Sequence, residues 1–110
     1  MDDEKTTEKV KKLFEDCSPV FIGLGDEQRQ KLILDIAEAG TDGINVTSLA
    51  AKSHLSRPAV SHHLKVLKDC GLIVPLKKGT QIFYRLNLLE PMERVRKLMD
   101  EMDRTLAIKN

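Results

Sequence analysis

The stretch from Ser56 to Gly71 constrains the fold more than any other part of the sequence, because both of its ends and one of its faces are marked. Ser56 can cap a helix start, Pro58 falls in the first turn, where it removes no intrahelical hydrogen bond, and Gly71 is the glycine expected just past the end. At about 100° per residue, three apolar side chains share one narrow stripe, namely Val60, Leu64 and Leu67. The stretch therefore predicts a helix that buries this stripe.

A shorter helix precedes this one. Thr47 is the predicted cap of the shorter helix, and Leu49 and Ala50 are expected to point inward. The helix should stop near His54, because a tight turn there needs a residue that tolerates left-handed backbone, as His does better than most. The pair predicts a helix-turn-helix over about residues 47–71.

Two β-prone runs follow, Leu72–Val74 and Gln81–Leu86, separated by Lys77-Lys78-Gly79-Thr80. A link of this kind, with its glycine, is typical of a β-hairpin turn. A cationic tip commonly lies along phosphates or beside the minor groove, although taken alone it can equally be an ordinary solvated turn. Because it follows a helix-turn-helix, we interpret residues 72–86 as a wing.

The formal net charge of +1 conceals an uneven distribution. From Ile44 to Asn87, seven basic residues stand against one acid, a net charge of +6, whereas the remainder carries eleven basic and sixteen acidic residues, a net charge of −5. The basic residues of the centre are Lys52, Arg57, Lys65, Lys68, Lys77, Lys78 and Arg85, and its acid is Asp69. A basic centre between acidic flanks fits a module with a localised DNA footprint, and acidic flanks would limit indiscriminate binding.

The face of the 56–71 helix opposite the apolar stripe offers hydrogen-bonding and cationic groups suited to a major groove. Together with the hairpin tip, this face gives the expected DNA contacts, which are Ser56, Arg57, Ala59, Ser61, His62, Lys65, Lys77, Lys78 and Thr80. His63 lies at the edge of the stripe. We therefore expect His63 to be a packed, hydrogen-bonded histidine rather than a base contact.

The N-terminal part predicts an amphipathic helix from about Thr6 to Cys17, because apolar residues recur there at helical spacing. Ser18-Pro19 then offers a cap and an N1-type proline, which predict a restart of the chain. The apolar residues after the restart, 20–24, are expected to form a short buried turn or helix.

A further helix is expected from Asp26, as its cap, to about Ala39, with Gly40 at its end. Its inward residues should be Leu32, Ile33 and Ile36. A turn over residues 41–43 would lead into the helix-turn-helix.

Beyond the wing, Pro91 is well placed in the first turn of a final helix. Apolar residues recur along that helix with spacings of 3, 4, 3 and 4, the pattern of a heptad seam. A core helix within one chain would show the same stripe, but charged residues on the other faces favour pairing with a second chain. With the first helix, the expected homodimer interface is Val10, Leu13, Phe14, Met92, Val95, Met99, Met102 and Leu106.

The chain of 110 residues, 41% of them apolar, suits a single domain over residues 1–110. The expected fold is mostly α-helical with a small β-hairpin, a dimeric winged helix-turn-helix of four helices, two strands and a terminal dimerisation helix over about residues 90–107.

The charged N-terminus and the lack of a long apolar run argue against a signal peptide and a membrane span, so a cytoplasmic protein is expected. Cys17 and Cys70 match neither a disulfide framework nor a zinc-finger spacing, and we expect reduced thiols.

The order of these elements resembles the ArsR/SmtB family of small dimeric winged-helix repressors, and the resemblance covers nearly the whole chain. The residues that carry it are Leu24-Gly25-Asp26 with Arg29, Leu49-Ala50, Leu55-Ser56 with Pro58, the run from Val60 to Leu67, Gly71-Leu72, and Gly79 with Tyr84-Arg85-Leu86. The resemblance implies a homodimer that binds an inverted-repeat operator in double-stranded DNA and represses transcription until a signal loosens the complex.

The sequence departs from the metal-sensing members of that family. Where arsenic, cadmium or lead sensors carry cysteines, this chain has Asn45 and Thr47, and no histidine follows the wing to build the zinc-type site on the last helix. We therefore expect no metal site and no cofactor. Cys17 and Cys70 remain: packing as small hydrophobes is the favoured interpretation, and a thiol switch is the sharper alternative.

Two other functions compete with sequence-specific DNA binding. A winged-helix module used only for protein assembly would present an apolar or acidic reading face, whereas this face is basic and polar. A hydrolase built on Ser61, His62 or His63 is weaker still, because neighbouring helix residues point about 100° apart and no acid is placed to orient a histidine. The sequence predicts a transcription regulator and not an enzyme, and it leaves the operator and the effector open.

Overall fold

The computed structural model describes residues 3–106. In chain order the elements are α1 (Asp3–Leu24), α2 (Glu27–Glu38), the 3-10 helix η1 (Gly40–Asp42), β1 (Ile44–Asn45), α3 (Val46–Ser53), α4 (Arg57–Asp69), β2 (Ile73–Lys78), β3 (Gln81–Leu86) and α5 (Leu89–Thr105). The mostly helical winged helix-turn-helix predicted from the sequence is confirmed. Over residues 3–106 no helix is both long and apolar enough to cross a bilayer.

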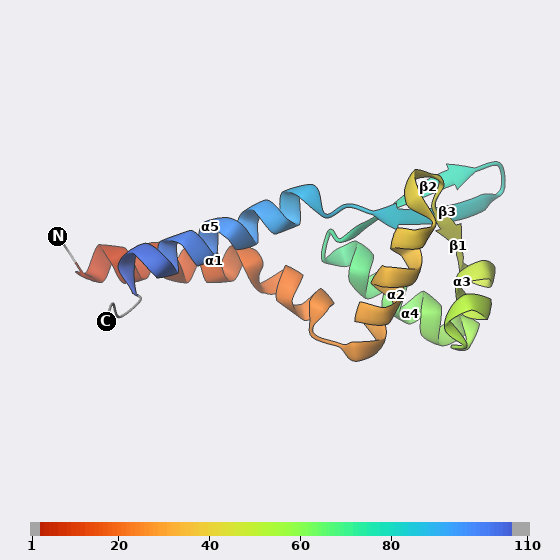
Figure 1. Cartoon of the computed structure of the whole chain (residues 1–110), viewed down its shortest axis with the longest axis horizontal. Helices are drawn as coiled ribbons and strands as arrows, with labels where there is room; N and C mark the ends of the chain where they lie inside the picture. Colours follow the sequence, from red (N-terminus) through yellow and green to blue (C-terminus); the bar gives the residue numbers. More distant parts are fainter. Residues whose placement is uncertain (1–2, 107–110) are drawn as a thin grey trace.

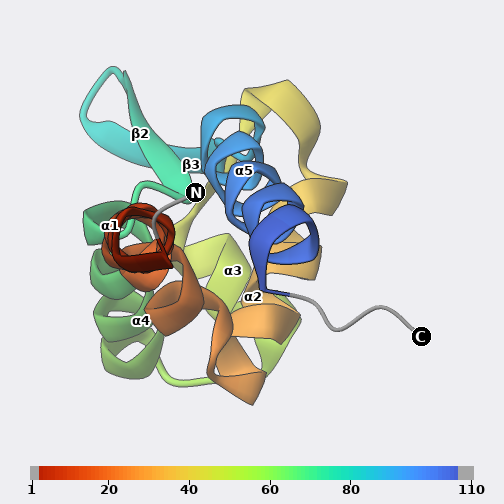
Figure 2. The same cartoon turned by 90° about the vertical axis from the view of Figure 1, so that its left-hand side faces the viewer.

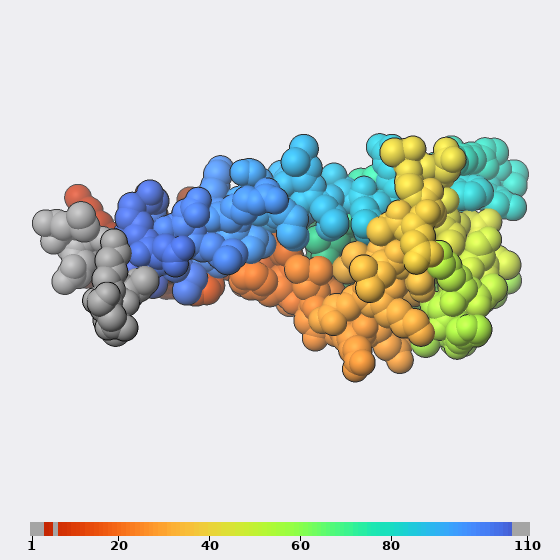
Figure 3. All heavy atoms as spheres, in the orientation of Figure 1, coloured from red at the N-terminus to blue at the C-terminus, as the bar shows by residue number. Residues whose placement is uncertain are grey.

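The molecule has two parts, which we call the stem (α1 and α5) and the winged body (residues 27–86). The two stem helices lie side by side and run in opposite directions, and the winged body sits at one end of them (Figure 1). The principal extents are 56 × 25 × 21 Å, and the space-filling view shows the stem as the narrower half (Figure 3). The fold is therefore elongated, with long helix faces left outside its core.

α4 holds the winged body together by burying its predicted stripe. Val60 and Leu67 are fully buried, and Leu64 is almost so. The cluster around them also contains Val20, Leu32, Ile36, Leu49, Ala50, Cys70, Leu72 and Ile73. Since each fully buried aliphatic side chain of this size contributes about 1.5–3 kcal/mol, this cluster dominates the stability of the body.

Both ends of α4 are set by the residues that the sequence marks. The Ser56 side chain accepts a hydrogen bond from the Ala59 N–H at 3.2 Å, and Pro58 stands in the first turn. At the far end Gly71 takes a φ of 79°, and the Leu72 N–H bonds back to the Leu67 carbonyl at 3.0 Å, as in a Schellman motif. The turn before α4 passes through His54 with a φ of 62°, so the predicted left-handed histidine is confirmed.

α2 also begins as expected. The Asp26 carboxylate accepts from the Arg29 N–H at 3.1 Å, and this bond lowers the pKa of Asp26. Leu32 and Ile36 are fully buried, and Ile33 packs at the edge of the same cluster. The turn predicted after this helix is the single 3-10 turn η1.

The hairpin is longer than its sequence pattern indicates. β2 pairs with β3 from Ile73 opposite Leu86 to Lys78 opposite Gln81, so only Gly79 and Thr80 form the turn. Gly79 has a φ of 63°, as a two-residue type II′ turn requires at its first position. Lys77 and Lys78 therefore belong to a strand and not to the turn, which corrects the sequence-based boundary.

The sheet has a third strand that the sequence analysis missed. β1 pairs antiparallel with β3 through Ile44 opposite Tyr84, which gives the strand order β1-β3-β2. A strand of two residues is too short to show an alternation of apolar and polar positions, so no local pattern announces it. Pro75 is tolerated in β2 because β2 is an edge strand.

The predicted restart at Ser18-Pro19 is wrong, because α1 runs unbroken from Asp3 to Leu24 with Pro19 inside it. The Ser18 hydroxyl donates to the Phe14 carbonyl at 2.9 Å instead of capping a new helix. Residues on both sides of the proline are anchored in clusters: Cys17 in the stem and Val20 in the body, both fully buried. Their burial outweighs the cost of a proline in the helix interior.

The residues after Pro19 are less buried than expected. Phe21 is 41% exposed and Ile22 is 60% exposed, whereas only Val20 is fully buried. In a continuous helix these neighbours point in different directions, so one of them faces the core and two face outward.

The heptad seam of the terminal helix is divided between two sides. Val95 and Met102 pack inside the chain against the stem cluster of Val10, Cys17 and Leu98. In contrast, Met99 is 59% exposed and Leu106 is 43% exposed. The expectation that the whole seam faces a second chain is therefore wrong for its inner half, because α1 of the same chain already covers it.

Polar contacts fix how the two stem helices pair. Glu101, buried among apolar residues, bonds to Arg104 and lies 3.2 Å from Lys9, and these hydrogen bonds lower the pKa of its carboxylate. About two turns nearer the body, Arg94 donates to the Asp16 carbonyl at 2.8 Å. The stem is thus held in one register along its length.

The predicted cap of α3 is wrong by two residues. The Asn45 side chain, not that of Thr47, accepts from the Ser48 N–H at 2.9 Å, and α3 begins at Val46. Asn45 is the last residue of β1 and directly precedes the helix, so its extended backbone suits a cap position.

This difference is testable by comparing two substitutions in chemical denaturation. Asn45→Ala should lower the free energy of unfolding by about 0.5–2 kcal/mol, the usual cost of losing a cap. Thr47→Ala, at an exposed position inside the helix, should change it by less than about 0.5 kcal/mol. A larger loss for Thr47→Ala than for Asn45→Ala would contradict the assignment of the cap.

Candidate nucleic-acid interface

The outer face of α4 is open to solvent along its length. Eight of the nine expected DNA contacts are exposed, namely Ser56, Arg57, Ser61, His62, Lys65, Lys77, Lys78 and Thr80, and Ala59 is half-buried. α4 and the tip of the β2–β3 hairpin project on the same side of the molecule, away from α2 and η1 (Figure 2). The structure therefore brings the helix contacts and the hairpin contacts to one side.

The two adjacent histidines of α4 have different environments. His62 is exposed, whereas His63 is half-buried with its Nδ1 3.5 Å from Arg29 Nη1 and its Nε2 3.3 Å from Gln28 Oε1. Burial is the largest cause that lowers the pKa of His63. The expectation of a packed, hydrogen-bonded His63 is confirmed.

Lys65 already has a partner on the outer face. Its Nζ lies 2.9 Å from the Asp69 carboxylate one turn along the helix, and both side chains are more than half exposed. An exposed pair of this kind is worth at most about 1 kcal/mol. Lys65 can therefore exchange Asp69 for a base edge or a phosphate at little cost.

The two lysines of β2 point to opposite faces of the hairpin. Lys78 donates to the Asp42 carbonyl at 2.6 Å, and its ammonium lies 4.6 Å from the centre of the Phe83 ring. These contacts join the hairpin to η1 in the body. Lys77 points the other way and is exposed, so Lys77 is better placed than Lys78 for a new contact.

A groove of about 360 Å³ lies between the hairpin and the N-terminal ends of α3 and α4. Polar groups line it, contributed by Asn45, Thr47, Arg57, Thr80 and Gln81. Asn45 Nδ2 donates to Gln81 Oε1 at 3.0 Å, which joins the start of α3 to the hairpin. The sequence analysis did not assign Asn45, Thr47 or Gln81 to the interface, because residues 36 apart in the chain meet there only through the sheet.

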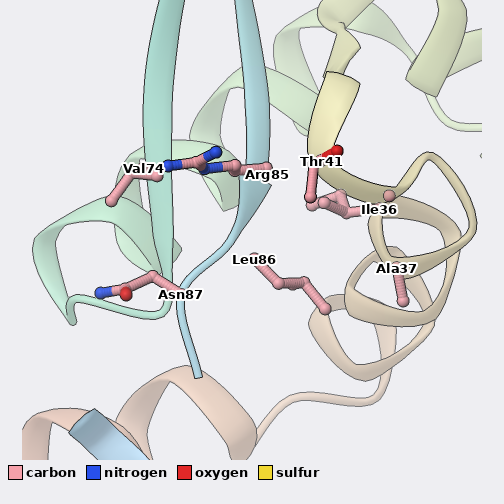
Figure 4. Close-up of a pocket in the computed structure, with 8 residues that line it drawn as sticks. Ile36, Ala37, Thr41, Val74, Arg85, Leu86 and Asn87 are labelled. Carbon is pink, nitrogen blue, oxygen red and sulfur yellow. The ribbon is translucent and has the colours of Figure 1, made fainter. Parts of the chain in front are cut away.

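A second cavity of about 400 Å³ lies at the base of the hairpin, beside the end of α2. Leu86 points from β3 toward α2, while Asn87 points away from it (Figure 4), and Asn87 donates to the Gly71 carbonyl at 3.1 Å. No residue of α4 lines this cavity among the residues described. It is therefore separate from the outer face of α4.

The stem presents an apolar outer surface. The exposed apolar residues of its two helices include Phe14, Phe21, Ile22, Met99 and Leu106. A hollow of about 380 Å³ between Phe14 and Leu106 continues this surface along α1. Of the expected dimer residues, Phe14, Met99 and Leu106 lie outside, Val10 is buried in the stem, and Leu13, Met92, Val95 and Met102 are partly buried.

The two cysteines belong to separate clusters. Cys17 is fully buried in the stem, with its thiol 3.3 Å from the Arg94 carbonyl, and Cys70 is buried in the body. Burial raises the pKa of both thiols, which disfavours the reactive thiolate. Within residues 3–106, no three His, Cys, Asp or Glu side chains are grouped so that they could hold a metal ion.

Comparison with known proteins shows that the chain is similar to bacterial transcription regulators. The family model "Bacterial regulatory protein, arsR family" matches residues 27–74, from α2 to the start of β2. The transcriptional repressor SdpR of Bacillus subtilis is 37% identical over 68 residues, which are 62% of this chain and 72% of SdpR.

Solved structures share the whole architecture. An ArsR-like transcriptional regulator from Rhodococcus sp. RHA1 superposes with a TM-score of 0.63 at 28% identity, covering 83% of this chain and 79% of its own. The homodimeric winged helix-turn-helix DNA-binding domain of Mb0332 from Mycobacterium bovis superposes with a TM-score of 0.66 at 20% identity, covering 91% and 90% of the two chains, a likeness of fold. The chain therefore belongs to the arsR family of bacterial regulatory proteins, and it is a DNA-binding transcription regulator.

Proposed function

We propose that this regulator is a homodimeric repressor that binds an inverted-repeat operator, with α4 in the major groove and the hairpin on the adjacent backbone. The observation that carries the proposal is the coincidence of the exposed polar face of α4, the basic hairpin and the groove between them on one side of the body. Direct readout requires a helix whose exposed side chains reach base edges, and phosphate contacts on either side fix its register. Both are available here.

The roles of the side chains follow from their positions. Ser61, His62 and Lys65 stand on the outward face of α4, where base edges would lie. Ser56, Arg57 and Ala59 occupy its first turn, with Arg57 lining the groove. Thr80 lines the groove from the hairpin, and Lys77 is the lysine of β2 that a phosphate can reach without breaking an existing bond.

Base contacts and phosphate contacts should respond differently to substitution. His62→Ala and Lys65→Ala should each reduce discrimination between the operator and a mismatched duplex, on the order of 1–3 kcal/mol for a genuine base contact. Lys77→Ala should weaken binding to all duplexes alike. It should also reduce the slope of the logarithm of the binding constant against the logarithm of the salt concentration by about the amount of one phosphate contact. Fluorescence anisotropy at several salt concentrations separates the two effects.

Lys31→Ala is the matched control, since Lys31 is an exposed lysine of α2, outside the proposed contacts on α4 and the hairpin. It should change neither discrimination nor salt dependence. Lys78→Ala should reduce the salt dependence less than Lys77→Ala, because Lys78 is already bonded to Asp42. Equal effects of His62→Ala and Lys65→Ala on specific and random duplexes would refute α4 as the reading helix.

We propose that two copies of the chain pair through the outer surface of the stem. Phe14, Met99 and Leu106 leave an apolar surface outside the chain's own core, and a second copy presenting the same surface would cover it by two-fold symmetry. The homodimer named for the Mycobacterium bovis domain agrees with this arrangement. A symmetric dimer then requires half-sites about 10 base pairs apart, or a multiple of that.

Met99→Glu should give monomers with little affinity for the operator, because a charge would be buried at the centre of the proposed surface. The exposed position of Met99 in one chain means that the monomer itself should stay folded. Light scattering measures the mass, and Met99→Leu, which keeps the apolar character, should remain dimeric. A dimeric Met99→Glu protein would place the interface elsewhere.

The signal is proposed to be something other than a metal ion at either of the family's metal-sensing positions. Asn45 and Thr47 offer neither thiolate nor imidazole, and α5 contains no histidine. The buried thiols of Cys17 and Cys70 favour a packing role over a redox switch, because burial raises the pKa of each.

Operator binding should therefore be unchanged by zinc, cadmium or arsenite, and by mild peroxide. The same titrations on a Cys17→Ser, Cys70→Ser protein identify the source of any response. Release by a metal that persists without the cysteines would reveal another metal site, whereas release by peroxide that disappears with them would establish the thiol switch.

A further inference from the structure

The C-terminal end of α1 is capped by side chains of α2. The carbonyls of the last helical turn have no partner within the helix. Arg29 Nη2 donates to the Ile22 carbonyl at 2.8 Å and Arg29 Nε donates to the Gly23 carbonyl at 3.1 Å. Gln30 Nε2 donates to the Leu24 carbonyl at 2.7 Å. A guanidinium at this end also complements the negative end of the helix dipole.

The third guanidinium nitrogen of Arg29, Nη1, lies against His63 of α4. Arg29 Nη1 lies 3.5 Å from His63 Nδ1, and His63 Nε2 lies 3.3 Å from Gln28 Oε1. A guanidinium only donates, so Nδ1 must carry the lone pair, and Nε2 must carry the hydrogen that Gln28 accepts. One neutral tautomer of His63 satisfies both contacts. Arg29 thus links the end of α1 to the middle of α4.

A second contact prevents the end of α1 from sliding over α4. A Cβ at Gly23 would lie 2.5 Å from Leu72 Cδ1 and 3.4 Å from Cys70 Cβ, so α1 passes directly against the segment that ends α4. Leu72 is fully buried and cannot move aside. In addition to this point and to the burial of Val20 beside the α4 stripe, the Arg29–His63 contact attaches the end of α1 to α4 and so restricts the angle between them.

We propose that Arg29 and His63 form a joint that holds α4 at a fixed angle to the stem, which makes His63 in its neutral form a positioning residue for sequence-specific DNA binding. The inference rests on the proposed function, because it takes α4 as the reading helix and the stem as the dimer contact. The two α4 helices of a dimer must match the spacing of two half-sites. A loosened joint costs specific affinity, while binding to random DNA through phosphates tolerates it.

Protonation of His63 opens the joint. A second proton would place an N–H of the ring against the Nη1–H of Arg29 and set two positive charges side by side. The charged groups that act on the ring are Asp26 and Arg29 of α2 and the neighbouring His62, whose ring centre is 5.7 Å away, while α1 offers backbone carbonyls.

The balance of these groups favours the neutral ring. Burial lowers the pKa of His63, Asp26 opposes this, and Arg29 and His62 reinforce it, so that the net direction is downward. A group with a lowered pKa stays neutral at pH 7 and gains its proton only on acidification below the ordinary histidine range. The joint is therefore closed at neutral pH and opens only on acidification below the ordinary histidine range.

The test measures a ratio of affinities with the full chain. The probes are a duplex that the wild-type protein enriches from a random library and a scrambled duplex of equal length, each titrated from pH 8 down to the lowest pH at which circular dichroism shows a folded protein. In the wild type, the ratio of the two affinities should fall about tenfold over this range, as expected for losing a hydrogen bond that involves a charged group. The ratio cancels the general gain in DNA binding that acid brings to any protein.

Four variants decide the matter. His63→Gln keeps a donor and an acceptor but cannot titrate, so its ratio should not change with pH. His62→Ala removes a proposed base contact and should lower the ratio at every pH, but the fall of the ratio on acidification should remain. Arg29→Lys keeps the charge but lacks the several N–H donors of a guanidinium, so the ratio of the two affinities at pH 7.5 should be about tenfold lower than in the wild type. Gln30→Ala removes a cap of α1 but leaves the joint intact, so its ratio should stay within about twofold of the wild-type value.

The outcomes separate the joint from the proposed function. Suppose that the wild-type protein does enrich a sequence. The joint alone would then be overturned if His63→Gln kept the pH dependence of the wild type, or if only His62→Ala lost it. A wild-type protein that enriches no sequence would overturn the proposed function and the joint with it. Should Arg29→Lys not fold, as judged by circular dichroism, the pH profile of His63→Gln still decides.

Discussion

The burial of the apolar stripe of α4 is the interaction on which the rest of the structure depends. α2, α3 and the hairpin each have only a partial apolar face, and these faces meet around Val60, Leu64 and Leu67. A helix that buries one face completely must turn the opposite face to solvent. The same packing that stabilises the body therefore leaves the polar face of α4, which carries the proposed DNA contacts, exposed to solvent.

α1 connects the two parts of the molecule because it contributes to both cores. Val10 and Cys17 belong to the stem cluster, whereas Val20 belongs to the body cluster. A single unbroken helix spans the distance between them, with its last turn capped by Arg29. The stem and the winged body are thus joined by one continuous helix rather than by a linker.

Local chemistry in the sequence determined the features of the body that a few neighbouring residues control. The cap at Ser56, the left-handed His54 and the glycine after α4 each depend on backbone preferences within one turn, so they could be predicted residue by residue. The buried stripe of α4 follows from helical spacing alone, and the hairpin follows from its glycine turn and its β-prone flanks. The uneven charge likewise marks residues 44–87, where the proposed DNA contacts lie, because charge is a property of the residues themselves.

Tertiary structure alone decided the features that depend on partners distant in the chain. Pro19 signals a helix start by local rules, but burial on both sides of it keeps α1 continuous. In the sequence, the apolar residues of α5 form one continuous stripe. Only the position of α1 shows that Val95 and Met102 are covered within the chain, whereas Met99 stays exposed. Contacts such as Asn45 with Gln81 and Arg29 with His63 join residues 36 and 34 positions apart. No local preference encodes such pairs, because they form only when the packing of the core brings their elements together.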